Sequence, residues 1–183
     1  MRAEMLMAKL TARGLLITGG AFGGRVELSW TDVAGGLGGL AKVPSELMRI
    51  MYLDDHRGEA VVLAALREFI LQMAMRNQIK ISKAVINGLA SLALHEVTSP
   101  PHCTACNGTG EVQLRIGVVR VCGKCDGSCY GTRASRDQAE IAGIPRTTFD
   151  RSYSWLAGRV YGECSGWLRE GIQHLAKQLA DAA

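Results

Sequence analysis

Apolar side chains recur every three or four residues along most of the chain beyond residue 44, which is the period of an α-helix with one buried face. The clearest run spans 58–75. Its apolar stripe consists of Leu63, Leu66, Phe69, Ile70 and Met73. A stripe of this kind predicts a core helix and not a cofactor site.

Shorter helices are expected on both sides of that run. Ser45 suits the N-cap of a helix before it, and Ser82 suits the N-cap of a helix after it, which the Ser99-Pro-Pro sequence should end. Farther on, Ser135 and Gln138 have the spacing of a capping box. A last apolar stripe predicts a terminal helix over 163–180.

The segment that follows the capping box predicts a helix-turn-helix. Ala139 is small enough to let two helices approach, Gly143 can take the turn, and Ile144 can fill the elbow. Phe149 would anchor a second helix that begins near Pro145 or Arg146 and runs on through residue 160. The same spacing also occurs at tight corners of ordinary helical proteins, so both interpretations stay open.

The glycine-rich N-terminal part predicts no long regular element. Two clusters between residues 15 and 40 hold eight glycines. A phosphate-binding loop is disfavoured because the Lys-Ser/Thr pair that holds a nucleotide is missing. Arg25 to Trp30 alternates like a short strand.

Two Cys-x-x-Cys pairs carry the strongest chemical signal in the chain. They are Cys103 with Cys106 and Cys122 with Cys125. Four thiols at this spacing predict a closed tetrahedral site for one structural Zn²⁺. Disulfides or a redox pair are disfavoured, because no secretory segment is present and a reducing cytosol favours thiolate ligands. The sequence 111–121 between the pairs predicts a short β-hairpin.

The two other cysteines, Cys129 and Cys164, are expected to be buried apolar thiols and not ligands. His102 adjoins Cys103, and a site of three cysteines and this histidine is a disfavoured alternative, because one of the four well-spaced cysteines would have to be displaced. A site closed by four protein ligands has no position for a catalytic water, so we do not expect an enzyme.

Composition narrows the remaining choices. Of 183 residues 48% are apolar and 5% aromatic, which suits a core of packed helices rich in Ala, Leu and Val. No run of eighteen apolar residues occurs, so we expect a cytoplasmic protein that does not span a membrane. The net charge of +4 is compatible with binding nucleic acid.

The fold class expected is mainly α: a helical domain with an inserted four-cysteine zinc finger that carries a β-hairpin, and a helix-turn-helix. We expect a glycine-rich N-terminal arm over 1–43 and a helical region over 44–100. The zinc finger should span 101–132, and the helix-turn-helix with the C-terminal helix should span 133–183.

Basic side chains gather around the finger and the helix-turn-helix. The exposed early face of the second helix would carry residue types that contact bases and phosphates, Arg146, Thr147, Asp150 and Arg151, to which helix geometry adds Ser152. The segment 112–136 holds five basic residues and one acid. Its basic residues, a candidate phosphate grip, are Arg115, Arg120, Lys124, Arg133 and Arg136.

The order of these motifs resembles the lambdoid phage late-gene antitermination proteins of the Q family. The resemblance covers roughly residue 58 to the C-terminus and is strongest at Cys103-Thr-Ala-Cys-Asn-Gly-Thr-Gly and Cys122-Gly-Lys-Cys-Asp-Gly. It implies that the four cysteines are Zn²⁺ ligands and that Arg151 is a basic residue of the second helix. Cys129 departs from the family pattern, which has glycine there.

The resemblance also implies a function. Members of that family bind double-stranded DNA within the late promoter, engage bacterial RNA polymerase at a sigma-dependent pause, and make it read through terminators. Two alternatives remain: a zinc-containing helix-turn-helix repressor, and a DnaJ-like zinc-finger chaperone module. The chaperone repeat shares Gly108 and Gly110, but the chain has two such repeats where that domain has four, and it has no His-Pro-Asp signature.

Overall fold

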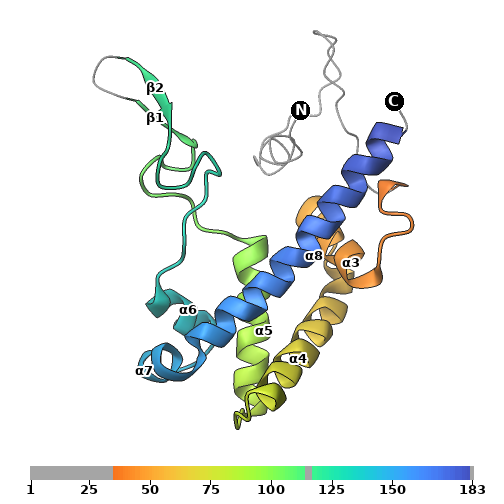
Figure 1. Cartoon of the computed structure of the whole chain (residues 1–183), viewed down its shortest axis with the longest axis vertical. Helices are drawn as coiled ribbons and strands as arrows, with labels where there is room; N and C mark the ends of the chain where they lie inside the picture. The colour runs from red at the N-terminus through yellow and green to blue at the C-terminus, as the bar shows by residue number, and fades with distance from the viewer. Residues whose placement is uncertain (1–34, 114–116, 182–183) are drawn as a thin grey trace. The chain divides into compact units, whose positions relative to one another are not determined.

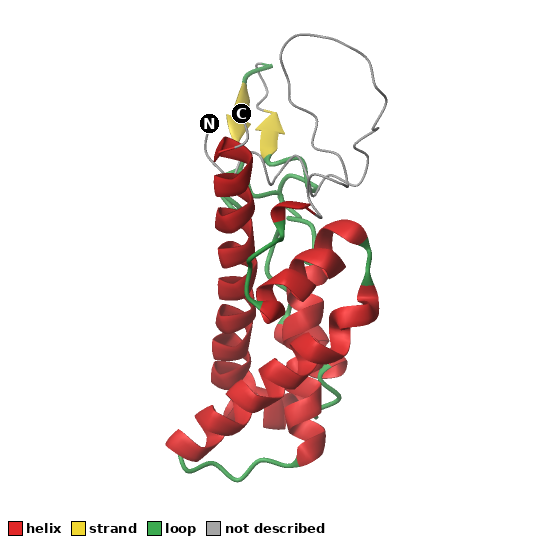
Figure 2. Cartoon of the chain, turned by 90° about the vertical axis from the view of Figure 1, so that its right-hand side faces the viewer, coloured by secondary structure: helices red, strands yellow, loops and turns green. Residues whose placement is uncertain are grey.

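The computed structural model describes residues 35–113 and 117–181. Helices dominate these residues, and the two short strands form one antiparallel hairpin (Figures 1 and 2). The mainly α class expected from the sequence, with a small hairpin and a four-cysteine cluster, is therefore confirmed. Most of the expected N-terminal arm, with the strand predicted over 25–30, lies outside the described residues.

The described chain forms two compact units, of which the first joins residues up to Val62 to residues from Gly166 onward. It contains α3 (Lys42–Leu53), the short 3₁₀ helix η1 (His56–Gly58), and the C-terminal part of α8 (Ser154–Asp181). Leu37, Met48 and Leu175 form its buried cluster. Helix α3 packs closely on α8 at Gly171, where an added Cβ would collide with the side chain of Met48.

The second unit, Leu63–Ser165, carries the cysteine pairs. Helix α4 (Glu59–Arg76) leads into it, and α5 (Lys83–Thr98) follows. Strands β1 (Glu111–Gln113) and β2 (Val119–Val121) come next, then α6 (Ser135–Ile141). The chain continues through α7 (Arg146–Thr148) and the π-helical turn η2 (Phe149–Tyr153) directly into α8.

The apolar stripe predicted for α4 is buried along its centre. Leu66 and Ile70 are fully buried, and Leu63, Phe69 and Met73 are half-buried. The remaining core of this unit includes Leu89 on α5, Phe149 in η2, and Leu156 and Val160 on α8, all fully buried. The terminal helix predicted from residue 163 is the second part of the longer α8.

One of the three predicted helix caps is confirmed. The Ser82 hydroxyl accepts a hydrogen bond from the Val85 N–H and caps α5. Ser45 is not a cap, because α3 begins at Lys42 and tolerates Pro44 in its first turn, where an N–H has no partner within the helix. Ser135 is also not a cap, because its hydroxyl bonds to the carboxylate of Asp150 instead.

Helices α5 and α6 approach each other closely at Gly88. A Cβ added to Gly88 of α5 would collide with the carbonyl oxygen of Ala142, at the end of α6. After α6 the chain turns at Gly143, whose φ of 63° is costly for other residues. The helices predicted on either side of Gly143 are therefore present, while their use as a DNA-binding helix-turn-helix stays a prediction.

We expect Gly88→Ala to lower the free energy of unfolding by about 1–3 kcal/mol, because its methyl group must push α6 away from α5. Gly158→Ala is the matched control, since nothing lies within 4 Å of a Cβ at that helical position. The control should raise stability by about 0.5–1 kcal/mol through helix propensity. Urea unfolding of both variants measures the difference, and equal effects would refute the close approach.

Candidate metal centre

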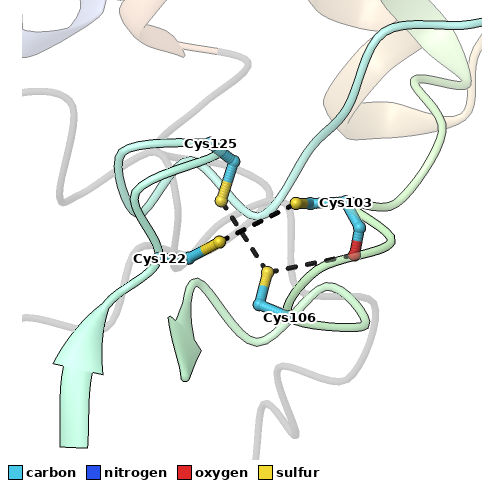
Figure 3. A group of neighbouring side chains, drawn as sticks. All are labelled: Cys103, Cys106, Cys122 and Cys125. Carbon is cyan, nitrogen blue, oxygen red and sulfur yellow. Dashed lines mark hydrogen bonds between the residues drawn. The ribbon is translucent and has the colours of Figure 1, made fainter.

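The four cysteines of the two pairs converge on one point. The sulfurs of Cys103, Cys106, Cys122 and Cys125 all lie within 4.8 Å of one another (Figure 3). The Sγ atoms of Cys103 and Cys122 are 3.9 Å apart, and those of Cys106 and Cys125 are 3.7 Å apart. A tetrahedron with metal–sulfur bonds of about 2.3 Å has edges of roughly 3.8 Å. The sulfur positions therefore fit a single tetrahedral ion.

The two segments that carry the sulfurs, 103–110 and 122–129, have the same backbone conformation, and we call them the two knuckles. In each, the residues one, two and four positions after the second cysteine have positive φ. These are Asn107 (49°), Gly108 (80°) and Gly110 (76°) in the first knuckle, and Asp126 (47°), Gly127 (78°) and Cys129 (71°) in the second. The left-handed backbone at these positions lets each knuckle turn back toward its own cysteine sulfurs.

The knuckles also hold each other through reciprocal hydrogen bonds. The Cys103 N–H donates to the Cys129 carbonyl at 2.9 Å, and the Cys122 N–H donates to the Gly110 carbonyl at 2.8 Å. Each knuckle thus binds the residue at which the other one ends. Cys129 occupies the position of Gly110 in this repeat, and its sulfur would lie 3.0 Å from a Cβ on Gly110.

The surroundings of the sulfurs set their ionisation. Burial opposes the thiolate of Cys106, but the Gly110 N–H donates to this sulfur at 3.3 Å, and neighbouring thiols add further hydrogen bonds. The pKa of Cys106 falls to about 6. Burial and the adjacent thiols raise the pKa of Cys125 to about 11. Ionisation of one cysteine therefore disfavours ionisation of the cysteine beside it. A cation bound between the sulfurs would stabilise all of the thiolates together.

The finger enters and leaves the helical part through a paired neck. His102 and Tyr130 form an antiparallel bridge, and their rings stack with centroids 6.3 Å apart. The Gly131 N–H donates to the Pro101 carbonyl at 2.8 Å. His102 therefore has a structural place beside the cysteines and does not belong to the cluster of four that could hold a metal ion.

Arg133 fastens this neck to the helices. Its Nε lies 3.2 Å from the Glu96 carboxylate of α5, and its Nη2 donates to the Ser99 carbonyl at 2.8 Å. Gln138 of α6 donates to the same carboxylate at 3.5 Å. We call this group (Arg133, Glu96, Ser99 and Gln138) the latch. It joins the end of α5, the exit of the finger and the start of α6.

Most residues predicted to contact DNA are exposed. They are Arg120, Lys124, Arg136, Arg146, Thr147, Arg151 and Ser152. The Arg133 side chain is only 18% exposed and is engaged in the latch, and Arg115 lies outside the described residues. DNA binding by these side chains stays a prediction.

Two features of the candidate DNA face were missed from the sequence: the contacts that Asp150 makes, and a π-helical turn. Asp150 accepts a hydrogen bond from Ser135 and pairs with Arg146 at 3.6 Å, so one carboxylate joins α6 to the next helix. The π-helical turn η2 contains Arg151 and Ser152. A π turn shifts the register of the residues that follow it, and no sequence pattern of polar side chains announces one.

The two remaining thiols differ in environment. Cys164 is fully buried in α8, and burial raises its pKa to about 12, so it is an inert apolar thiol. Cys129 is half-buried beside the cluster, and its thiol donates to the Gly127 carbonyl at 3.5 Å. Neither thiol belongs to the group of four.

No protein-family model matches this chain, and no curated protein matches it either.

Within the part of the chain that the structure describes, no helix combines the length and the apolarity needed to cross a bilayer.

We expect Cys106→Ser to abolish stoichiometric metal binding and to unfold the finger, because the free energy of metal binding is largely the free energy of folding in such a small lobe. Metal per chain, measured by inductively coupled plasma mass spectrometry, should fall from one equivalent to near zero.

Cys129→Gly is the control, because glycine adopts positive φ readily and Cys129 lies outside the cluster. It should keep one equivalent of metal. Full retention of metal by Cys106→Ser, or its loss from Cys129→Gly, would contradict this assignment of ligands.

Proposed function

We propose that this protein is a sequence-specific DNA-binding antitermination factor that acts in the cytoplasm of a bacterial host cell. It would load onto RNA polymerase, with its sigma factor, at a promoter-proximal pause and promote readthrough of terminators in phage late genes. The observation that carries the proposal is the connection, through the latch, between the segment that carries the cysteine cluster and α6, the first helix of the predicted helix-turn-helix. The resemblance of the cysteine knuckles to the Q family supplies the biological role.

The metal is a structural Zn²⁺ in this proposal. Four cysteine sulfurs in tetrahedral arrangement are typical of zinc or of iron–sulfur centres. Sulfurs within 4.8 Å of one another suit a single shared ion and leave little room for a cluster of several irons. Four protein ligands would leave the ion no open position for water or substrate, which supports a structural and not a catalytic role.

The DNA-contacting face would be the start of the helix that follows Gly143. Arg146, Thr147, Arg151 and Ser152 are exposed there, at the N-terminal end of a long helix. Recognition helices commonly present their N-terminal residues to base edges in the major groove. Arg136, exposed on α6, is suitably basic for a flanking phosphate. Asp150 would fix the side chain of Arg146 until DNA replaces it.

A purified transcription reaction tests the proposal. On a template with the late promoter and a downstream terminator, adding the protein should raise the fraction of transcripts that pass the terminator. A plain repressor would instead block initiation, and a chaperone module would change neither step. Unchanged termination on a template that the protein binds would rule out antitermination.

Arg151→Ala should weaken specific DNA binding by about 1–3 kcal/mol while the protein stays folded, because Arg151 is exposed and makes no ion pair in the described part of the chain. Arg76→Ala is the matched control, since Arg76 is exposed at the end of α4. Fluorescence anisotropy at several salt concentrations measures both. Equal losses in the two variants would point to a general charge effect and not to a specific contact.

A further inference from the structure

The hairpin of the finger exposes apolar side chains that the proposed DNA contact does not use. Val118, Val119 and Val121 are 50%, 54% and 66% exposed. A phosphate grip needs basic and polar atoms, and exposed valines gain little from a charged backbone. This surface is better suited to another protein.

No described residue pairs with the backbone of β2 on its outer side. Val112 pairs with Arg120, and the Cys122 N–H donates to the Gly110 carbonyl. Hydrogen-bonded and non-bonded pairs alternate in an antiparallel ladder, so Val119 and Val121 are at non-bonded positions, where N–H and C=O point away from β1. Among the described residues, β1 is the one strand that pairs with β2 (Figure 1). We call Val119, Arg120 and Val121 the open edge.

The side chains of the open edge alternate in character. Val119 and Val121 lie on one face of the hairpin, and Arg120 lies on the other, because successive side chains of a strand point to opposite faces. A hollow of about 250 Å³ opens beside Arg120 and is lined also by Val112, Val121 and Gly123. Arg120 is the one charged residue among these four, and its guanidinium would favour an incoming carboxylate.

A second copy of the chain does not fit this edge well. Antiparallel pairing of two β2 strands about their centres would place Arg120 opposite Arg120, and like charges directly across a ladder are unfavourable. A strand with apolar residues beside the two valines and an acidic residue beside the arginine meets both requirements.

We propose that the open edge of β2 binds an extended segment of a partner protein in which apolar and acidic residues alternate, by adding it as a third strand. The partner's backbone would bond to the N–H and C=O groups of Val119 and Val121. Its apolar side chains would cover the valines, and its carboxylate would pair with Arg120. Arg120 then serves a protein contact and not the phosphate contact first predicted for it.

A model peptide tests this without DNA or polymerase, so the result is independent of the proposed function. The probe is a fluorescein-labelled peptide of about eight residues, alternating valine and glutamate, long enough to span the edge. A peptide alternating valine and lysine is its matched control. Anisotropy with the metal-loaded full chain should detect binding of the glutamate peptide and much weaker binding of the lysine peptide.

Two proline variants separate the two edges of the hairpin. Val121→Pro removes an N–H that points outward from β2, and Gln113→Pro removes one that points outward from β1. Both should keep one equivalent of metal, which shows that the finger is folded. Val121→Pro should weaken binding of the glutamate peptide about tenfold, and Gln113→Pro should leave its affinity unchanged.

Charge reversal completes the test. Arg120→Glu should reverse the preference, so that the lysine peptide binds more tightly than the glutamate peptide. Equal binding of both peptides by the unmodified protein, equal loss in the two proline variants, or an unreversed preference in Arg120→Glu would overturn the proposal. Loss of duplex DNA affinity in Val121→Pro, with no peptide binding, would assign the edge to DNA instead.

Discussion

The convergence of four cysteine sulfurs within 4.8 Å is the constraint on which the finger depends. The buried cluster of this lobe consists of Cys103, Cys106 and Cys122, with Val112 and Cys125 packed against it. Its hairpin exposes valines to solvent where a larger domain would bury them. So small an apolar cluster cannot offset the entropy of ordering the loop, and an ion held by all four sulfurs would supply the missing free energy.

Hydrogen bonds connect the cysteine cluster to the neck of the finger and to the helices beyond it. Each knuckle accepts the first N–H of the other, and the neck at His102 and Tyr130 closes behind them. The latch then ties the exit of the finger to α5 through Arg133 and Glu96, and α6 to the same carboxylate through Gln138. Buried on most of its surface, this ion pair gives the short connection a defined path. The cysteine cluster is therefore connected to α5 and α6 by a continuous set of contacts.

Local signals in the sequence predicted much of this arrangement. The Cys-x-x-Cys spacing, the helical stripe around Leu66 and the Ser82 cap are each set by neighbours in the chain, and the structure bears them out. Other features depend on residues distant in sequence. Ser135 has the spacing of a capping residue, yet its hydroxyl reaches Asp150, fifteen residues away. From the sequence alone Arg133 would be a surface charge, but it lies in the connection after the finger and pairs with Glu96 of α5. The π turn likewise leaves no trace in the pattern of polar residues.

X-ray absorption at the metal edge is the sharpest test of the four-sulfur site, because it reports the atoms around the ion in the intact chain. We expect this spectrum to show zinc with four sulfur neighbours at about 2.3 Å and no second metal. A spectrum with nitrogen or oxygen ligands in place of one or more sulfurs, or with a metal–metal distance, would contradict it.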